Sequence, residues 1–539
     1  MAIKISGNVV LTYDGANYSN TNIAVGYQAL NANTTGTNNT AEGYQALYLN
    51  TTGAANTAVG SLALYNNTTG GNNTAVGGQA LYLNTTGIQN AALGFNALYS
   101  NTTGNQNIAV GVGALYSNTI GIYNTSVGSA ALYTNTTGNY NTAVGFNALP
   151  SNTTGSNNTA MGYQALYSNT TGQWSTAIGY QALYNNTTGT ANGTAMGYQA
   201  LFSNTTGYAV TAMGEIALYS NTTGIQNTAV GQQALYSNTI GTQNTAYGFY
   251  SLYANTTGYY NTAVGAQALQ ANTTGYYNIA VGGLALLSNT TGIYNTAVGY
   301  QALYFNTTGY QNTAMGLIAL QFNTTGYQNT AMGYSALLDN TTGVQNTALG
   351  TNTGRGITTG NYNTIIGAQV TGLSSSLSNT VIIADGQGNQ RIYVNSSGNM
   401  GVATTSPSYT LDVNGNIHTS NLYYSSDQRF KKNITPITNG LDKIEKINPV
   451  RFEWNEFVNQ RRNGYKLNEP TIGVLAQEVE QVIPEIVDTW KLSDDCTDAR
   501  SVSYAKLNMV LIVAVKELHG IVKDLQLKVS DLQSKVTAK

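Results

Sequence analysis

Short apolar runs alternate with polar turn residues along most of the chain. In the typical copy NTAVGFNALPSNTTGSN, from Asn141 to Asn157, the apolar runs are Thr142-Ala143-Val144 and Ala148-Leu149-Pro150. Both runs are too brief for a helix and are bounded by turn residues, so the copy predicts two short strands. Gly145 is expected to precede one corner. The segment Asn152–Gly155 is expected to form the other, because Asn can bond its own backbone and Gly can adopt positive φ.

The glycine after the first apolar run recurs at a fixed period. It forms 21 markers from Gly26 to Gly367, spaced by 17 residues except for one spacing of 18 across Thr190–Gly193. Such a period predicts a solenoid whose units bury their apolar faces only against neighbouring units, with the insertion as a local loop. Residues one period apart should stack as in cross-β ladders: Asn152 on Asn135 and Asn169, and Leu149 on Leu132 and Leu166.

The period fails after Gly367, and the pattern then changes twice. Four short strand signals follow, at Thr380–Ala384, Arg391–Val394, Met400–Val402 and Thr410–Val413, with Asn414-Gly415 as a tight-hairpin signal. They predict a small β-rich neck over residues 373–425.

The last segment predicts a coiled-coil helix from about residue 505. Its apolar residues repeat every seven positions, and Asn508 falls at an earlier a position, where a polar residue can fix register and strand number. Val at a with Leu at d favours two strands in simple coils, so the helix alone does not argue for three. The a residues are Val515, Val522, Val529 and Val536, and the d residues are Leu511, Leu518, Leu525 and Leu532.

Charge is concentrated after the repeats. Of 42 charged residues, 37 lie beyond residue 350, and the others are Lys4, Asp14, Glu42, Glu215 and Asp339. A shaft with one Lys and no Arg cannot neutralise a phosphate backbone, which argues against nucleic-acid binding. Its four acidic residues are many coils apart, which argues against the paired carboxylates of a glycosidase.

The remaining candidate chemistry is sparse. Asp494–Asp498 favours a solvated loop over a metal cluster, and neither His418 nor His519 has ligand spacing, so we expect no metal and no cofactor. The N-terminus does not resemble a secretory signal, no apolar run is long enough to span a membrane, and Cys496 is the single cysteine. These features favour folding in the cytoplasm without membrane insertion.

Tyrosine is unusually frequent and should form aromatic stripes. The 40 Tyr residues recur after the marker Gly and after Ala-Leu, as at Tyr163 and Tyr167. Tyr combines an apolar face with a hydroxyl and suits both chain packing and sugar or protein recognition. Packing between chains and surface cover is the favoured interpretation, and a receptor site is the alternative.

The recurring Ala-Val-Gly, Ala-Leu and Asn-Thr-Ala-Val-Gly pattern over residues 22–367 resembles the head repeats of trimeric autotransporter adhesins. That resemblance implies a left-handed β-roll assembled from three chains.

Three separated groups of motifs stand out in the C-terminal region. They are Leu411–Ile417 with Ser426–Ile434, then Ile472–Val479 with Pro484-Glu485, and finally Ala505–Leu507 with Ala514–Leu518. In this order they resemble the intramolecular chaperone domain of endosialidase tailspikes and phage tail fibres. This resemblance covers residues 423–539 and implies a domain that drives trimerisation and then releases itself by cleavage.

The same resemblance implies the roles of two residues. Ser426 would be the nucleophile, Lys431 its base, and Ser425–Ser426 the scissile bond. A Ser hydroxyl needs a base to take its proton, and Lys serves only if burial lowers its pKa enough to leave it neutral. The alternative is that both residues merely cap or decorate a turn.

We therefore expect a mainly β protein: an elongated, homotrimeric β-solenoid or β-roll, a β-neck, an α+β chaperone domain and a coiled-coil helix. The expected boundaries are 1–21 for a cap or attachment segment, 22–372 for the shaft, 373–425 for the neck and 426–539 for the chaperone. The expected function is that of a structural tail fibre of a phage or phage-like virion, assembled in the host cytoplasm, with no activity on external substrates. Its expected partners are two further copies, a fibre or baseplate component at the N-terminus, and a host-surface glycan or protein. The alternative is a trimeric adhesin of the bacterial surface.

Overall fold

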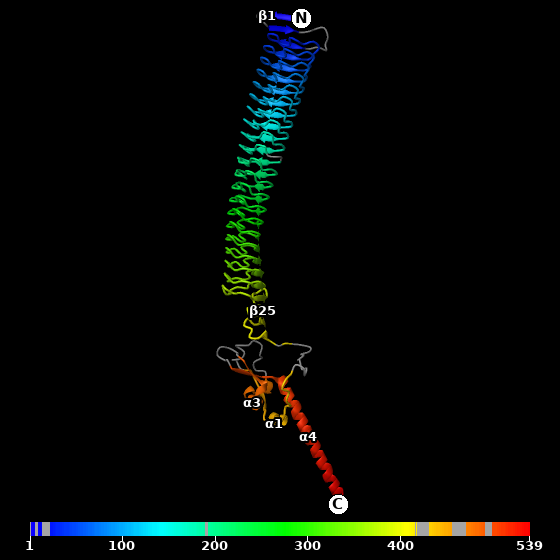
Figure 1. Cartoon of the computed structure of the whole chain (residues 1–539), viewed down its shortest axis with the longest axis vertical. Coiled ribbons are helices and arrows are strands. Elements are labelled where there is room, and N and C mark those ends of the chain that lie inside the picture. The colour runs from blue at the N-terminus through cyan, green and yellow to red at the C-terminus, as the bar shows by residue number, and fades with distance from the viewer. Residues whose placement is uncertain are drawn as a thin grey trace. The chain divides into compact units, whose positions relative to one another are not determined.

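The chain forms two structural units, Met1–Ser397 and Gly398–Lys539. The computed structural model (Figure 1) describes residues 2–5, 9–12, 22–188, 192–415, 417, 431–454, 470–490 and 498–538. Among these, no helix is long and apolar enough to cross a membrane.

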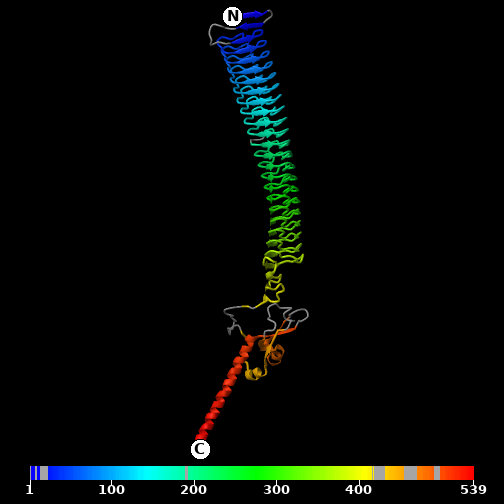
Figure 2. The same cartoon turned by 180° about the vertical axis from the view of Figure 1, so that it is seen from behind.

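The first unit is a β-solenoid, which confirms the predicted architecture. One three-residue strand per coil pairs in parallel with the strands of the coils before and after it, and the coils lie one above another in Figures 1 and 2. Ala143 of β10 lies opposite Ala160 of β11, which is one period later. The strands are β3 Ile23–Val25, β4 Thr40–Glu42, β5 Thr57–Val59, β6 Thr74–Val76, β7 Ala91–Leu93, β8 Ile108–Val110, β9 Thr125–Val127, β10 Thr142–Val144, β11 Thr159–Met161, β12 Thr176–Ile178, β13 Thr194–Met196, β14 Thr211–Met213, β15 Thr228–Val230, β16 Thr245–Tyr247, β17 Thr262–Val264, β18 Ile279–Val281, β19 Thr296–Val298, β20 Thr313–Met315, β21 Thr330–Met332, β22 Thr347–Leu349 and β23 Thr364–Ile366.

The 18-residue coil leaves the stack continuous. Thr176 of β12 pairs with Thr194 of β13 in the same register as its neighbours. The insertion itself falls largely on residues 189–191, which lie outside the described residues.

The second predicted strand of each coil is wrong. Leu149 has a φ of 53° and Asn147 a φ of 49°, so this run forms a turn. The turn is set by the stack, because the Leu149 N–H donates to the carbonyl oxygen of Ala165 in the next coil over 2.9 Å. A left-handed Leu costs about 1–2 kcal/mol locally, and stacking with full burial of the Leu149 side chain offsets that cost.

The two glycines of each copy serve different purposes. Gly145 has a φ of 134°, and a Cβ there would lie 2.6 Å from the carbonyl oxygen of Gly162. Gly155 is not at positive φ, contrary to the prediction. It is needed for close approach, since a Cβ there would collide with Asn152 Oδ1 and the carbonyl oxygen of Gly172.

Two asparagine ladders line the buried corners. Asn152 Nδ2 donates to Asn135 Oδ1 over 2.8 Å, and Asn169 Nδ2 donates to Asn152 Oδ1 over 2.9 Å, which confirms the predicted ladder. The second ladder was not predicted: the backbone N–H of Asn158 donates to Asn141 Oδ1 over 3.0 Å. The stacked Ala and Leu side chains of successive coils form one continuous apolar core.

The stack runs one coil further than the marker glycines indicate. Strand β24, Val381–Ala384, lies one period after β23 and pairs with it in parallel. The sequence pattern had predicted that this strand belongs to the neck. It then turns back into β25, Gln390–Val394, as an antiparallel partner. At the other end, β1, Ala2–Ile5, pairs antiparallel with β2, Val9–Thr12, and β2 contacts β3.

The second unit combines short hairpins with one long helix. Its apolar core comprises Ile447, Val479, Ile483, Ile486 and Val510. The elements are β26 Met400–Val402, parallel to β27 Leu411–Val413; α1 Gly440–Glu445; β28 Pro449–Phe452, antiparallel to β29 Thr471–Val474; α3 Ala476–Val482; the 3-10 helix η2 Pro484–Ile486; β30 Val487–Trp490, antiparallel to β31 Ala499–Val502; and α4 Tyr504–Thr537. The residues that would follow the Asn414-Gly415 hairpin signal lie mostly outside the described residues.

Candidate functional site

The predicted dyad is only partly described. Ser425 and Ser426 lie outside the described residues, whereas Lys431 is described and its side chain is exposed. The pairing of Ser426 with Lys431 stays a prediction.

Downstream of Lys431, α1 docks closely on α4. Gly440 is buried, and a Cβ there would lie 2.6 Å from the backbone nitrogen of Ala514 and 2.9 Å from the carbonyl oxygen of Val510. Any larger residue would push the two helices apart. Gly440 was not predicted from the sequence, where its one signal is the Asn-Gly pair at residues 439–440.

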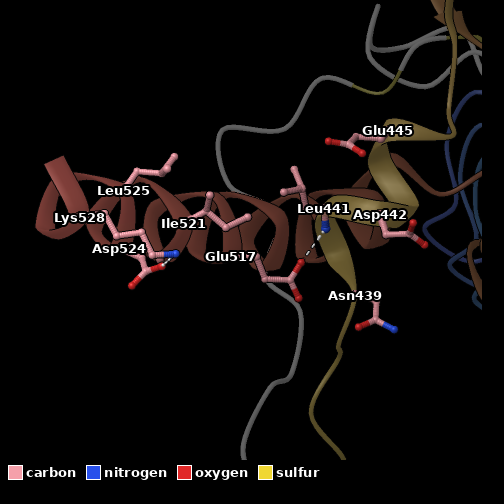
Figure 3. A pocket seen from close by; sticks show the side chains of 10 residues that line it. Asn439, Leu441, Asp442, Glu445, Glu517, Ile521, Asp524, Leu525 and Lys528 are labelled. Atoms are coloured by element: carbon pink, nitrogen blue, oxygen red, sulfur yellow. Dashed lines mark hydrogen bonds and ion pairs between the residues drawn. The ribbon is translucent and has the colours of Figure 1, made fainter. Parts of the chain in front are cut away.

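A carboxylate holds the first turn of α1 in place. Leu441 donates its backbone N–H to Glu517 Oε2 over 2.7 Å (Figure 3). Asn439, which precedes α1, is left-handed with a φ of 58° and makes no side-chain cap bond. Glu517 therefore supplies the acceptor that an N-terminal N–H group needs, and its negative charge suits the helix dipole.

An open groove of about 670 Å³ lies between α1 and α4. Asp524 and Lys528 in its wall form an ion pair at 2.9 Å (Figure 3). Within the part of the chain that the structure describes, no cluster of three or more His, Cys, Asp or Glu side chains is placed to hold a metal ion. The lining residues are Asn439, Leu441, Asp442, Glu445, Glu517, Gly520, Ile521, Asp524, Leu525 and Lys528.

The middle motif, Ile472–Val479, provides the scaffold of this unit. It supplies β29 and the start of α3, and Val479 is fully buried in the core. Glu480 pairs with Arg500 of β31 at 2.6 Å, tying α3 to the second hairpin. These residues support the fold of the unit.

Helix α4 confirms the predicted helix and leaves its heptad stripe uncovered in one chain. Ser503 caps its N-terminus, and Val510 and Ala514 are buried beneath α1. The a and d side chains are exposed by 43–76%: Leu511, Val515, Leu518, Val522, Leu525, Val529, Leu532 and Val536. An exposed apolar stripe of this length indicates an interaction surface. Asn508 and His519 are also exposed on this helix. The coiled coil stays a prediction.

The tyrosine stripes are stacked columns. Tyr167 and Tyr184 have ring centroids 4.9 Å apart and planes 3° apart, and similar pairs recur along the solenoid. Because each ring covers part of its neighbour, a column offers mostly ring edges and hydroxyls to the surroundings. Glu42, Glu215 and Asp339 lie on separate coils, while Asp14, His418 and residues 494–497 lie outside the described residues.

Comparison with known proteins bears on the C-terminal region. Residues 426–488 match the family model described as chaperone of endosialidase. This match confirms the resemblance inferred from the motifs that begin at Ser426 and Ile472.

Among curated proteins, the chain is similar to long tail fiber proteins Gp37. It is 36% identical to that of Enterobacteria phage K3 over 113 residues, covering 21% of this chain and 9% of the relative. It is 36% identical to that of Enterobacteria phage T2 over 113 residues, covering 21% and 8%. An uncharacterized membrane protein of Dictyostelium discoideum is 36% identical over 117 residues, covering 20% and 7%. The chain thus spans less than a tenth of the length of each of these relatives.

Proposed function

We propose that this protein is a structural tail fibre of a phage or phage-like virion, assembled in the host cytoplasm and used to attach to the host surface. The proposal rests on one observation: the same chain has an unbroken β-solenoid and a C-terminal region that matches a chaperone family and phage tail fibres. A solenoid whose units depend on their neighbours needs correct alignment at one end, and a C-terminal chaperone can supply that alignment.

The fibre assembles from three copies of the chain. The uncovered heptad stripe of α4 supports self-association, because burying such a stripe contributes about 25 cal/mol per Å² of apolar surface. The number of three comes from the resemblance to trimeric chaperones and adhesin heads, since Val at a and Leu at d alone favour two.

Assembly is followed by self-release. Ser426 Oγ attacks the carbonyl carbon of Ser425 while Lys431 takes the hydroxyl proton and returns it to the leaving amide nitrogen. The Ser425–Ser426 peptide bond breaks as an ester forms, and water then hydrolyses the ester. Lys431 is exposed in one chain, so cleavage would wait until assembly buries it.

At the N-terminal end, the hairpin β1–β2 caps the stack and pairs with another fibre or baseplate component. The contact of β2 with β3 supports the capping role. A trimeric bacterial adhesin is the second candidate, favoured by the repeats alone, which resemble adhesin heads.

The chaperone role is tested by synthesis with and without residues 426–539. We expect the chain ending at Ser425 to aggregate or stay monomeric when made alone, whereas the full chain gives a trimeric shaft. Soluble, trimeric shaft from the shortened chain would contradict the proposal.

A further inference from the structure

Near the C-terminal end of the solenoid, one surface position departs from the repeat. The residue six places after the marker glycine varies between coils: it is most often serine, as at Ser151, Ser168 and Ser220, and elsewhere Ala, Asn, Thr, Leu or Gly. In three successive coils it is Phe305, Phe322 and then Asp339. Phe and Asp occupy this position in no other coil of the shaft, and they leave the stack intact, which indicates a local task beyond folding.

These residues line an open groove of about 610 Å³ on the solenoid surface. The rings of Phe305 and Phe322 stack with centroids 5.6 Å apart and are 41% and 42% exposed. The groove therefore has an apolar aromatic wall that a single chain leaves open. Its lining residues are Ser288, Phe305, Thr307, Phe322, Thr324, Asp339, Thr341 and Thr358.

The threonines among the lining residues form a row of hydrogen-bond acceptors. Thr307 Oγ1 donates to the carbonyl oxygen of Thr324 over 3.1 Å, and Thr324 and Thr341 repeat this bond to the next coil. Because each hydroxyl proton is already used along the stack, the hydroxyl oxygens offer only acceptor lone pairs. The row rises by about 4.8 Å per coil, the spacing of paired strands.

Asp339 closes the groove with a fixed carboxylate. Its Oδ2 accepts from Arg355 Nε over 2.7 Å and from the Gly356 N–H over 2.9 Å, and its Oδ1 accepts from Arg355 Nη2 over 3.3 Å. The carboxylate is thereby oriented, and Oδ1, with a single long bond, retains acceptor capacity. None of the eight lining residues is cationic.

We propose that this groove binds a neutral, hydroxyl-rich oligosaccharide, so that it is a receptor-binding site of the fibre; this rests on the attachment function proposed above. The C–H faces of sugar rings would pack on Phe305 and Phe322, and sugar hydroxyls would donate to the Thr row and to Asp339. An acidic sugar is disfavoured, because none of the lining residues is cationic and the nearby Arg355 guanidinium is already paired with Asp339.

The test is binding of the full-length protein to an array of defined neutral and acidic bacterial-surface oligosaccharides. The double variant Phe305→Ser and Phe322→Ser restores the serine found in other coils, so the stack should be kept. Phe146→Ser is the matched control, because Phe146 is 48% exposed and the preceding coil has Ser129 at that place. We expect wild type to bind neutral oligosaccharides, the double variant to bind at least about tenfold more weakly, and the control to bind within about twofold.

The oligomeric state of each variant is measured by native mass spectrometry alongside the array. Three results would overturn the groove as a glycan site. The double variant could retain binding, the wild type could bind only acidic sugars or none, or the double variant could have an altered oligomeric state. The last result would place the groove between copies of the chain. If the double variant adsorbs to host cells as well as the trimeric wild type does, the groove alone is rejected. If the wild type fails to form trimers, the proposed function is rejected.

Discussion

Asn152 donates its side-chain amide to Asn135 Oδ1, 17 residues earlier, over 2.8 Å, and donates again to the carbonyl oxygen of Gly155 over 2.9 Å. The Asn152 side chain is fully buried, so each coil is bonded both to itself and to the coil beneath it. A sequence period is thus converted into a column of buried hydrogen bonds.

Replacing Asn152 by Ala should destabilise the solenoid by about 2–3 kcal/mol per chain, because buried polar partners on three coils, Asn135, Gly155 and Asn169, lose their bonds. The measurement is the unfolding rate in denaturant, since a long assembled shaft resists equilibrium unfolding. Thr154→Ala is the control: Thr154 is exposed in the same turn, and its replacement should change stability by less than about 0.5 kcal/mol. Equal effects of the two substitutions would contradict the ladder's role.

Gly155→Ala should prevent the coils from stacking at that point, because the added Cβ would overlap the Gly172 carbonyl in the next coil. Thermal unfolding should show a marked loss, or the protein should fail to assemble. Gly520→Ala makes the matched comparison, since a Cβ at this exposed position of α4 meets nothing within 4 Å. That change should stabilise the helix by about 0.5–1 kcal/mol. A tolerated Gly155→Ala would show that the close approach is relaxed in solution.

Acid should weaken the end of the shaft through Asp339. Partial burial raises the pKa of this carboxyl, but the hydrogen bonds from Arg355 and Gly356, together with the Arg355 charge, outweigh burial and lower the pKa below its usual range. A carboxyl with a lowered folded-state pKa contributes stability above its unfolded pKa of about 3.9, and this stability is lost as pH falls through the lower, folded value. Unfolding rates measured from pH 6 down to pH 2 should therefore rise less steeply in Asp339→Asn than in wild type. Identical pH profiles would show that Asp339 does not couple to stability.

The second asparagine ladder is interrupted at the 18-residue coil, which predicts a local weakness. Its place is taken in three successive coils by Ser175, Gly193 and Val210, and the Asn-to-Asn bonds resume at Asn244, which donates to Asn227 Oδ1. Hydrogen exchange measured by mass spectrometry should be faster for coils 175–227 than for coils 56–158, because fewer side chains bridge adjacent coils there. Uniform protection along the shaft would mean that strand pairing alone sets local stability.

Much of the solenoid could be predicted because its signals are periodic. The 17-residue spacing alone places Asn152 over Asn135 and Leu149 among other leucines. The turn at Leu149 could not be predicted, because a short apolar run between turn residues indicates a strand. The positive φ of Leu149 is fixed by its hydrogen bond to Ala165 of the next coil. The role of Gly155 was misassigned for a similar reason: close approach between coils is a property of the stack and leaves no signal in one copy.

The C-terminal site was predicted less completely. Heptad spacing predicted the helix that became α4, and the motif at Ile472–Val479 contributed to a resemblance that the match of residues 426–488 to the chaperone family model confirms. Contacts between segments far apart in the sequence, such as Gly440 against Ala514 or Leu441 to Glu517, have no local pattern. The dyad of Ser426 and Lys431 rests on resemblance alone.

Native mass spectrometry of the freshly expressed wild type, beside Ser426→Ala and Lys431→Ala, tests most directly whether the C-terminal region assembles the fibre and then leaves it. We expect wild type to appear as a trimer of residues 1–425 with residues 426–539 released, and both variants as trimers of the intact chain. Wild type found as intact monomers would contradict the account, and intact wild-type trimers would contradict its self-release.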